Sequence, residues 1–193
     1  MTADESAVLD ACVLVQAPLR DTLLRLAEPP ALYRPRWSDA IIAETRRALE
    51  NQIGLSPDKT AYLEGQLRRY FSDSWVFGFE PLAGKMTNDP GDRHVLAAAV
   101  HAGAGKIVTF NKRHFPREST LRWSVEAVGP AAFLEDLYLL HPKDVTDRLR
   151  QQSANLGRSL DTQLAVLAKA VPSFVEIVRR DLGHVTSPSA PTP

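Results

Sequence analysis

The chain has 193 residues, 44% of them hydrophobic and 24% charged, and its 23 basic and 23 acidic residues leave a formal net charge of zero. These values fit one globular domain with a helical extension, and they exclude a protein that binds nucleic acid through its overall charge. Cys12 is the single cysteine, which excludes an internal disulfide and a cysteine-rich metal site. The N-terminal sequence has no basic-then-apolar signal and no apolar run reaches the ~20 residues of a membrane span, so we expect a cytoplasmic protein without membrane contact.

Strands and helices are expected to alternate through the first 140 residues. Short buried strands are predicted by apolar runs, and helices by apolar positions three or four residues apart. Ser38 is expected to cap a helix, and Pro57 and Pro90 to stand at the first positions of two others. In chain order we expect strands at 7–10, 32–35, 75–77, 106–110 and 124–128. We expect helices at 13–26, 38–49 and 57–71, one that begins at Pro90 and ends before Gly103, and one that begins near residue 130.

This alternation predicts an α/β fold with a central parallel sheet flanked by helices. Beyond His141 the pattern is helical only, with a helical pair followed by a last helix that ends at Gly183. The final residues are small, polar and rich in proline, which is typical of disorder. We therefore expect three parts: a core domain over 7–128, a helical extension over 129–183 and a disordered tail over 184–193.

Four acidic residues are candidates for a metal site, and each also has an ordinary structural explanation. Asp10 ends the first strand, where ligands bind in open parallel sheets, or else caps the next helix. Glu44 lies on the shoulder of an apolar helix stripe, or else pairs with Arg47. In the Asp89-Pro-Gly-Asp92 sequence, Asp89 is the natural helix cap, which leaves Asp92 free to face a ligand.

If the fold brings these carboxylates together, their mutual repulsion favours a divalent cation among them, and phosphoryl chemistry is the usual use of such a site. The stretch 106–123 carries five Lys or Arg residues and one Glu, which suits a polyanionic substrate or a solvated loop equally well. The five histidines show no metal-binding spacing, and we expect His94 and His101 to be surface or core residues. Dinucleotide loops, Walker sequences and serine-hydrolase motifs are absent from the sequence.

An ordered set of short motifs extends this interpretation. The set is Val8-Leu-Asp10-Ala-Cys12, Glu44 on an early helix, Asp89-Pro-Gly-Asp92-Arg-His-Val-Leu-Ala-Ala-Ala99, Ile107-Val-Thr-Phe-Asn111 and Phe115-Pro116. It resembles the PIN-domain family of metal-dependent ribonucleases, in particular the VapC-type toxins of bacterial toxin–antitoxin pairs. The resemblance covers about residues 7–128 and implies a PIN-like three-layer fold.

The resemblance also implies a Mg²⁺-dependent endoribonuclease, with Mn²⁺ as an expected substitute. Asp10, Glu44, Asp92 and Asn111 would be catalytic, and Asp10, Asp92, Glu44 and Asp89 would hold the metal. Arg93, Thr109, Lys112 and Arg113 would contact the RNA substrate. The implied partners are a cognate antitoxin, whose C-terminal segment lies across the groove, and a second copy of the chain in a homodimer.

Two positions depart from the family pattern. Cys12 stands where the family usually has Asn or Ser, and Asn111 stands where it often has a fourth Asp. These departures keep open a catalytically silent PIN-like module that binds RNA or protein. A structure-specific DNA nuclease built on the same site is a third hypothesis.

Overall fold

The structure is a computed structural model that describes residues 5–185. Backbone contacts divide the chain into two compact units, with the boundary between Pro130 and Ala131. The first unit contains the whole sheet and all the predicted site residues. The predicted domain limits at 128 and 183 stay a prediction.

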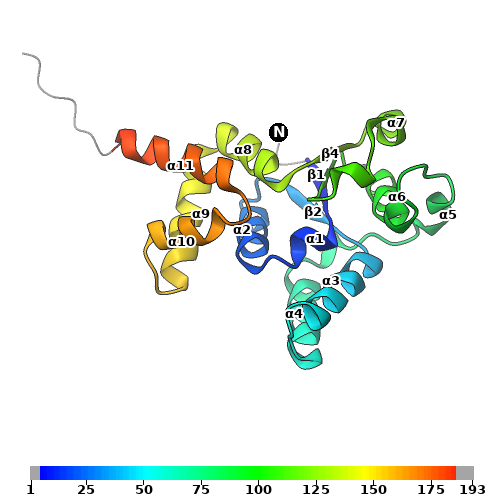
Figure 1. Cartoon of the computed structure of the whole chain (residues 1–193), viewed down its shortest axis with the longest axis horizontal. Helices are drawn as coiled ribbons and strands as arrows, with labels where there is room; N and C mark the ends of the chain where they lie inside the picture. Colours follow the sequence, from blue (N-terminus) through cyan, green and yellow to red (C-terminus); the bar gives the residue numbers. More distant parts are fainter. Residues whose placement is uncertain (1–4, 186–193) are drawn as a thin grey trace, which may run out of the picture. The chain divides into compact units, whose positions relative to one another are not determined.

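The first unit is built on a four-stranded sheet in which every pairing is parallel, in the order β2-β1-β3-β4 (Figure 1). The strands are β1 (Ser6–Leu9), β2 (Arg34–Arg36), β3 (Lys106–Val108) and β4 (Glu126–Val128). Ala7, Val8 and Leu9 are fully buried, as expected for a central strand covered on both faces. The predicted α/β fold with a parallel sheet is confirmed.

Helices occupy the connections between these strands. Those of the first unit are α1 (Ala11–Leu14), α2 (Ala17–Ala27), α3 (Asp39–Asn51), α4 (Pro57–Tyr70), α5 (Glu80–Ala83), α6 (Arg93–His101) and α7 (Arg117–Thr120). Four short 3-10 turns complete it: η1 (Ser72–Ser74), η2 (Pro90–Asp92), η3 (Lys112–His114) and η4 (Leu121–Trp123). Ser38 caps α3 by accepting a hydrogen bond from the Ile41 amide, as predicted.

The strand order places a topological switch point between β1 and β3. From β1 the chain crosses to β2 on one side, and it then returns to place β3 on the other side of β1. Because such crossovers are right-handed, successive connections cover opposite faces of the sheet and leave a crevice at the carboxyl ends of β1 and β3. Asp10 directly follows β1, and Thr109 directly follows β3.

Two predicted elements of this unit are wrong. The helix expected over 13–26 is broken into α1 and α2, because the chain leaves the helical conformation at Gln16 and restarts with Pro18 in the first turn. The strand expected at 75–77 makes one isolated parallel bridge, between Trp37 and Trp75. The bridge does not extend because Phe77 faces solvent and Gly78 turns the chain with φ of +76°.

The second unit is helical, as predicted. It contains α8 (Pro130–Leu140), α9 (Pro142–Asn155), α10 (Leu160–Leu167) and α11 (Pro172–Val185). The predicted stop at Gly183 is wrong, because α11 continues through that residue. Residues 186–193 of the predicted tail lie outside the described part of the chain. None of the helices within 5–185 is long and apolar enough to cross a membrane.

Candidate metal centre

Asp10 lies at the switch point and is 3% exposed. Its backbone amide donates to the Val108 carbonyl at 3.1 Å, so the sheet ladder fixes the position of the residue beyond the end of β1. The side chain therefore leaves the carboxyl edge of the sheet from a rigid base.

A hydrogen-bond network holds one oxygen of the Asp10 carboxylate. The Thr109 hydroxyl donates to Oδ2 at 2.6 Å, and the Cys12 thiol donates to the same oxygen at 3.2 Å. The amide of Asn111 donates in turn to the Thr109 hydroxyl at 2.9 Å, and the amide of Phe110 donates to the Cys12 sulfur at 3.3 Å. Within residues 5–185 this leaves Oδ1 as the carboxylate oxygen available to a ligand.

Cys12 is part of this network and not a reactive thiol. Burial, with the negative charge of Asp10 as the next cause, raises the pKa of the Cys12 thiol to about 11. The thiol is therefore neutral at physiological pH and acts as a weak hydrogen-bond donor to Asp10.

The two carboxylates of the Asp-Pro-Gly-Asp sequence have different roles, as predicted. Asp89 caps the 3-10 turn by accepting a hydrogen bond from the Gly91 amide at 2.9 Å. Asp92 makes no capping hydrogen bond, although it stands at the N-terminus of α6. Its carboxylate is therefore free to face the crevice.

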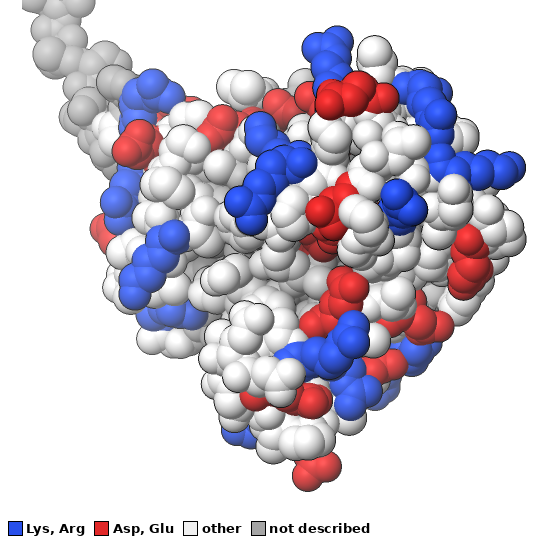
Figure 2. Space-filling model, turned by 45° about the vertical axis from the view of Figure 1, so that its right-hand side comes forward, with Lys and Arg blue, Asp and Glu red and all other residues white. Residues whose placement is uncertain are grey.

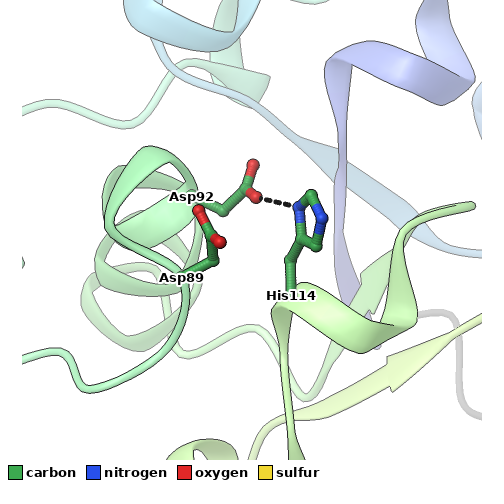
Figure 3. A group of neighbouring side chains, drawn as sticks. All are labelled: Asp89, Asp92 and His114. Atoms are coloured by element: carbon green, nitrogen blue, oxygen red, sulfur yellow. Dashed lines mark hydrogen bonds and ion pairs between the residues drawn. The ribbon is translucent and has the colours of Figure 1, made fainter.

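His114, from η3, contacts Asp92 directly. Its Nδ1 lies 2.6 Å from Oδ2 of Asp92, and its Nε2 accepts a hydrogen bond from Nε of Arg113 at 3.2 Å. With Nε2 as an acceptor, the imidazole proton belongs on Nδ1, and the ring donates to Asp92 (Figure 3).

Asp89, Asp92 and His114 each offer a ligand atom, and these atoms lie within 4.8 Å of one another (Figure 3). This group could hold a metal ion as a set of three. However, the Nδ1 atom that would bind the ion is the atom that donates to Asp92. We therefore interpret His114 as the residue that orients Asp92, in the way that outer hydrogen bonds fix metal ligands in proteins.

The charge of Asp92 is unfavourable in this setting. Burial raises the pKa of Asp92, and the negative charges of Asp10 and Asp89 raise it further, although the hydrogen bond from His114 opposes them. Asp10 and Asp92 both line the same groove, so the negative charge of each lies in the surroundings of the other. A bound cation would remove the penalty that these like charges impose.

Glu44 projects from α3 beside the same crevice. Its Oε1 atom lies 3.5 Å from Nε2 of His94, which belongs to the first turn of α6. Burial lowers the pKa of His94, but the Glu44 carboxylate outweighs burial and the pKa is raised. The pair connects α3 to α6, and Glu44 lines the same groove as Asp10 and Asp92.

These side chains border one groove of about 470 Å³. Its lining includes Asp10, Cys12, Glu44, Asp92, Phe110 and Asn111. The four residues predicted to be catalytic thus share one groove, whereas Asp89 is not among its lining residues. Figure 2 shows acidic side chains reaching the surface near the middle of the face in view, with Lys and Arg side chains around them.

The residues predicted to contact substrate lie in different environments. Lys112 and Arg113 are exposed on η3, directly after Asn111. Arg93 is partly buried at the start of α6. Thr109 is fully buried behind Asp10, and its hydroxyl faces that carboxylate.

Three contacts of this site were missed by sequence reasoning. His94 was expected to be a surface or core residue, but it pairs with Glu44. No role was assigned to His114 from the sequence, and Cys12 was identified only as a departure from a family pattern. The spacing of His94, two residues after Asp92 on the same helix, was the one available signal. His114 carried no local signal, because its partner is 22 residues away.

The fold and site together define an α/β protein with an acidic groove at the carboxyl edge of a parallel sheet. Its sequence is 34% identical over 110 residues to a Mycobacterium tuberculosis protein named "Putative ribonuclease VapC50". That match covers 55% of this chain and 65% of the relative, so it spans a little under two thirds of the relative's length. No family model matches the chain, and no solved structure matches it.

Proposed function

We propose that the protein is a divalent-metal-dependent endoribonuclease of the VapC type, within the PIN-domain family. The observation that carries the proposal is the shared groove: Asp10, Glu44, Asp92 and Asn111 come from four separate segments and border one cavity. The similarity to a mycobacterial protein named as a ribonuclease supports the same conclusion.

The donor set fits a hard divalent cation. Oδ1 of Asp10 and the carboxylates of Asp92 and Glu44 offer oxygen atoms, which Mg²⁺ and Mn²⁺ prefer. The Cys12 sulfur is engaged with Asp10 and the Phe110 amide, so it does not add a soft ligand. When bound, the cation would stabilise negative charge on the scissile phosphate and lower the pKa of water.

The protein residues would position the reactants. Asp10 and Asp92 would hold the cation, with Thr109 and Cys12 orienting the first and His114 the second. Glu44, kept in place by His94, would orient the attacking water or complete the metal shell. Asn111 would contribute a neutral oxygen, which gives this site one negative charge fewer than a four-acid site.

The RNA backbone would run past η3 and the start of α6. Lys112 and Arg113 are exposed there and follow Asn111 in the chain, and Arg93 follows Asp92. Such contacts to phosphates increase affinity for RNA but do not confer sequence specificity. Thr109 is better assigned to positioning Asp10 than to touching substrate, since its side chain is fully buried.

We extend the proposal to the biological role implied by the resemblance. The protein would be the toxin of a toxin–antitoxin pair, would form homodimers, and would be inhibited by an antitoxin segment lying across the groove. Co-expression with candidate antitoxins and light scattering of the purified chain would test these partners separately.

The direct test is cleavage of a panel of defined tRNAs and of matched single-stranded DNA, with Mg²⁺ or with EDTA. We expect Mg²⁺-dependent cleavage of RNA and a loss of more than about a hundredfold for Asp92→Asn, with an unchanged circular dichroism spectrum. Retained Mg²⁺-dependent activity in Asp92→Asn would remove Asp92 from the mechanism.

A silent PIN-like module is the second candidate, because Asn111 and Cys12 replace residues that the family usually has. It predicts RNA binding with neither cleavage nor saturable binding of Mn²⁺. Preferential cleavage of the DNA arm would instead indicate a DNA nuclease.

A further inference from the structure

Among the described residues, Phe110 is the one aromatic side chain that lines the acidic groove. It is 43% exposed, and it borders the groove together with Asp10, Glu44 and Asp92. An apolar ring open to water beside carboxylates does not contribute to the core. The ring is therefore open to a ligand in the groove, and a ligand with a flat apolar part beside a charged part would match it.

The backbone that carries Phe110 is fixed on both sides. Its own amide donates to the Cys12 sulfur at 3.3 Å, and the next amide, of Asn111, donates to the Thr109 hydroxyl at 2.9 Å. Both acceptors also contact Oδ2 of Asp10. The ring is therefore held at a defined place relative to the carboxylate that would bind the metal.

Positive charge follows Phe110 directly. Lys112 and Arg113 are exposed on the next turn of the chain, and no carboxylate within the described residues forms an ion pair with either. Residues 110–113 thus place an aromatic ring next to two basic side chains. In single-stranded nucleic acids, bases stack on such rings while basic side chains contact the phosphates.

We propose that Phe110 is a base-stacking platform for single-stranded RNA, next to the phosphate that is cleaved. This rests on the proposed ribonuclease function and names a subsite of the same groove. A base next to the scissile phosphate would unstack from the neighbouring bases and stack on the Phe110 ring. Stacking is tolerant of sequence and stronger for purines, so the subsite would favour adenine over uracil without reading hydrogen-bonding edges.

The test uses the full chain in the Asp92→Asn background, so that RNA is bound and not cut. The probes are fluorescein-labelled octaadenylate and octauridylate, and the readout is fluorescence anisotropy in Mg²⁺. Phe110→Leu keeps an apolar side chain of similar size and the amide bond to Cys12, but it removes the aromatic face. Phe77→Leu is the matched control, because Phe77 is 61% exposed and lies outside the lining of the acidic groove.

We expect Phe110→Leu to weaken octaadenylate binding about tenfold and to narrow the preference for adenine, while Phe77→Leu changes neither. Phe110→Trp should restore affinity, and its tryptophan fluorescence should be quenched when octaadenylate binds. In the active background, Phe110→Leu should raise the KM for RNA more than it lowers kcat.

Equal affinity of the Phe110 and Phe110→Leu proteins for both probes would overturn the inference and leave the ribonuclease intact. A change in oligomeric state without a change in RNA affinity would overturn it in favour of a protein contact. If the unmutated chain cleaves no RNA in the tRNA panel, the ribonuclease proposal fails, while quenching of Phe110→Trp still reports whether the ring meets RNA. Absence of any RNA binding would overturn both.

Discussion

The two oxygens of the Asp10 carboxylate have different surroundings. Oδ2 accepts a short hydrogen bond from Thr109 and a longer one from Cys12, whereas Oδ1 has no hydrogen-bond partner among the described residues. Because a hydroxyl is a stronger donor than a thiol, Thr109 should orient the carboxylate more firmly than Cys12 does.

Thr109→Val should therefore lower metal affinity and RNA cleavage by about 10- to 100-fold, the usual cost of losing a hydrogen bond to a metal ligand. Thr109→Ser should recover most of the loss, and Cys12→Ser should change activity by less than about threefold. Mn²⁺ titration and initial cleavage rates would measure these effects. A loss in Thr109→Ser as large as that in Thr109→Val would contradict the claim that the hydroxyl alone orients Asp10.

The Cys12 thiol should react slowly with thiol reagents. Its pKa is raised to about 11 by burial and by Asp10, against an ordinary value of 9.0. Since the thiolate is the reactive form, labelling at pH 8 should be about a hundredfold slower than for a free cysteine, and heat denaturation should restore the ordinary rate. Absorbance after adding an aromatic disulfide reagent gives the rate. Rapid labelling of the folded chain would contradict the described burial.

Asp92 should make the metal-free protein less stable at neutral pH. Its folded pKa is raised above the ordinary 3.8, so its contribution to stability is complete below about pH 3.8 and is lost as pH rises through the folded pKa. Asp92→Asn keeps an acceptor for His114 and removes the charge, so we expect a slightly higher melting temperature than wild type at pH 7 in EDTA. The difference should shrink as pH falls towards 4. A lower melting temperature for the variant at pH 7 would argue against repulsion among the acids.

At the scale of elements, the position of Glu44 depends on how α3 is held. Glu64 on α4 accepts hydrogen bonds from Arg46 on α3 at 2.9 Å and from Arg68 at 2.9 Å. Arg68 also pairs with Asp39, at the start of α3, and lies 3.8 Å from the centre of the Trp75 ring. This small network joins α3 to α4.

Glu64→Gln should destabilise the protein by about 0.5 kcal/mol at pH 7 and low salt. Burial raises the pKa of Glu64, but hydrogen bonds from Arg68 and Arg46 outweigh burial and lower it below the ordinary 4.5. The contribution is therefore present above about pH 4.5 and is lost as pH falls through the lowered pKa. Urea unfolding at pH 7 and pH 3 would measure it, and a penalty of the same size at both values would contradict the ionic origin.

Local sequence signals predicted most elements, and they failed where tertiary contacts decide. Ser38 and Pro57 marked helix starts correctly, and Pro90 marks the start of the 3-10 turn η2, three residues before α6, because capping and proline geometry act within a few residues. The break at Gln16 was missed, because the apolar spacing continues across it. The apolar run Trp75–Phe77 favours a strand, but in the structure only Trp75 makes a bridge, to Trp37.

At the scale of the molecule, the parallel sheet brings residues that are distant in sequence to one edge. Asp10 and Thr109 are 99 positions apart in sequence, yet adjacent strands β1 and β3 place their side chains 2.6 Å apart. The sequence could predict the acids and the edge of the sheet where ligands bind. It could not predict His114 and His94 as the partners of Asp92 and Glu44, because those contacts depend on how η3 and α3 pack against α6.

A calorimetric titration of the full chain with Mn²⁺ tests the central claim most directly. We predict saturable Mn²⁺ binding to the unmutated chain and to Glu64→Gln, an acid-removal control outside the groove, and loss of Mn²⁺ binding in Asp10→Asn and Asp92→Asn. Equal Mn²⁺ binding in all four proteins, or none in the unmutated chain, would contradict the claim that these acids form a cation site.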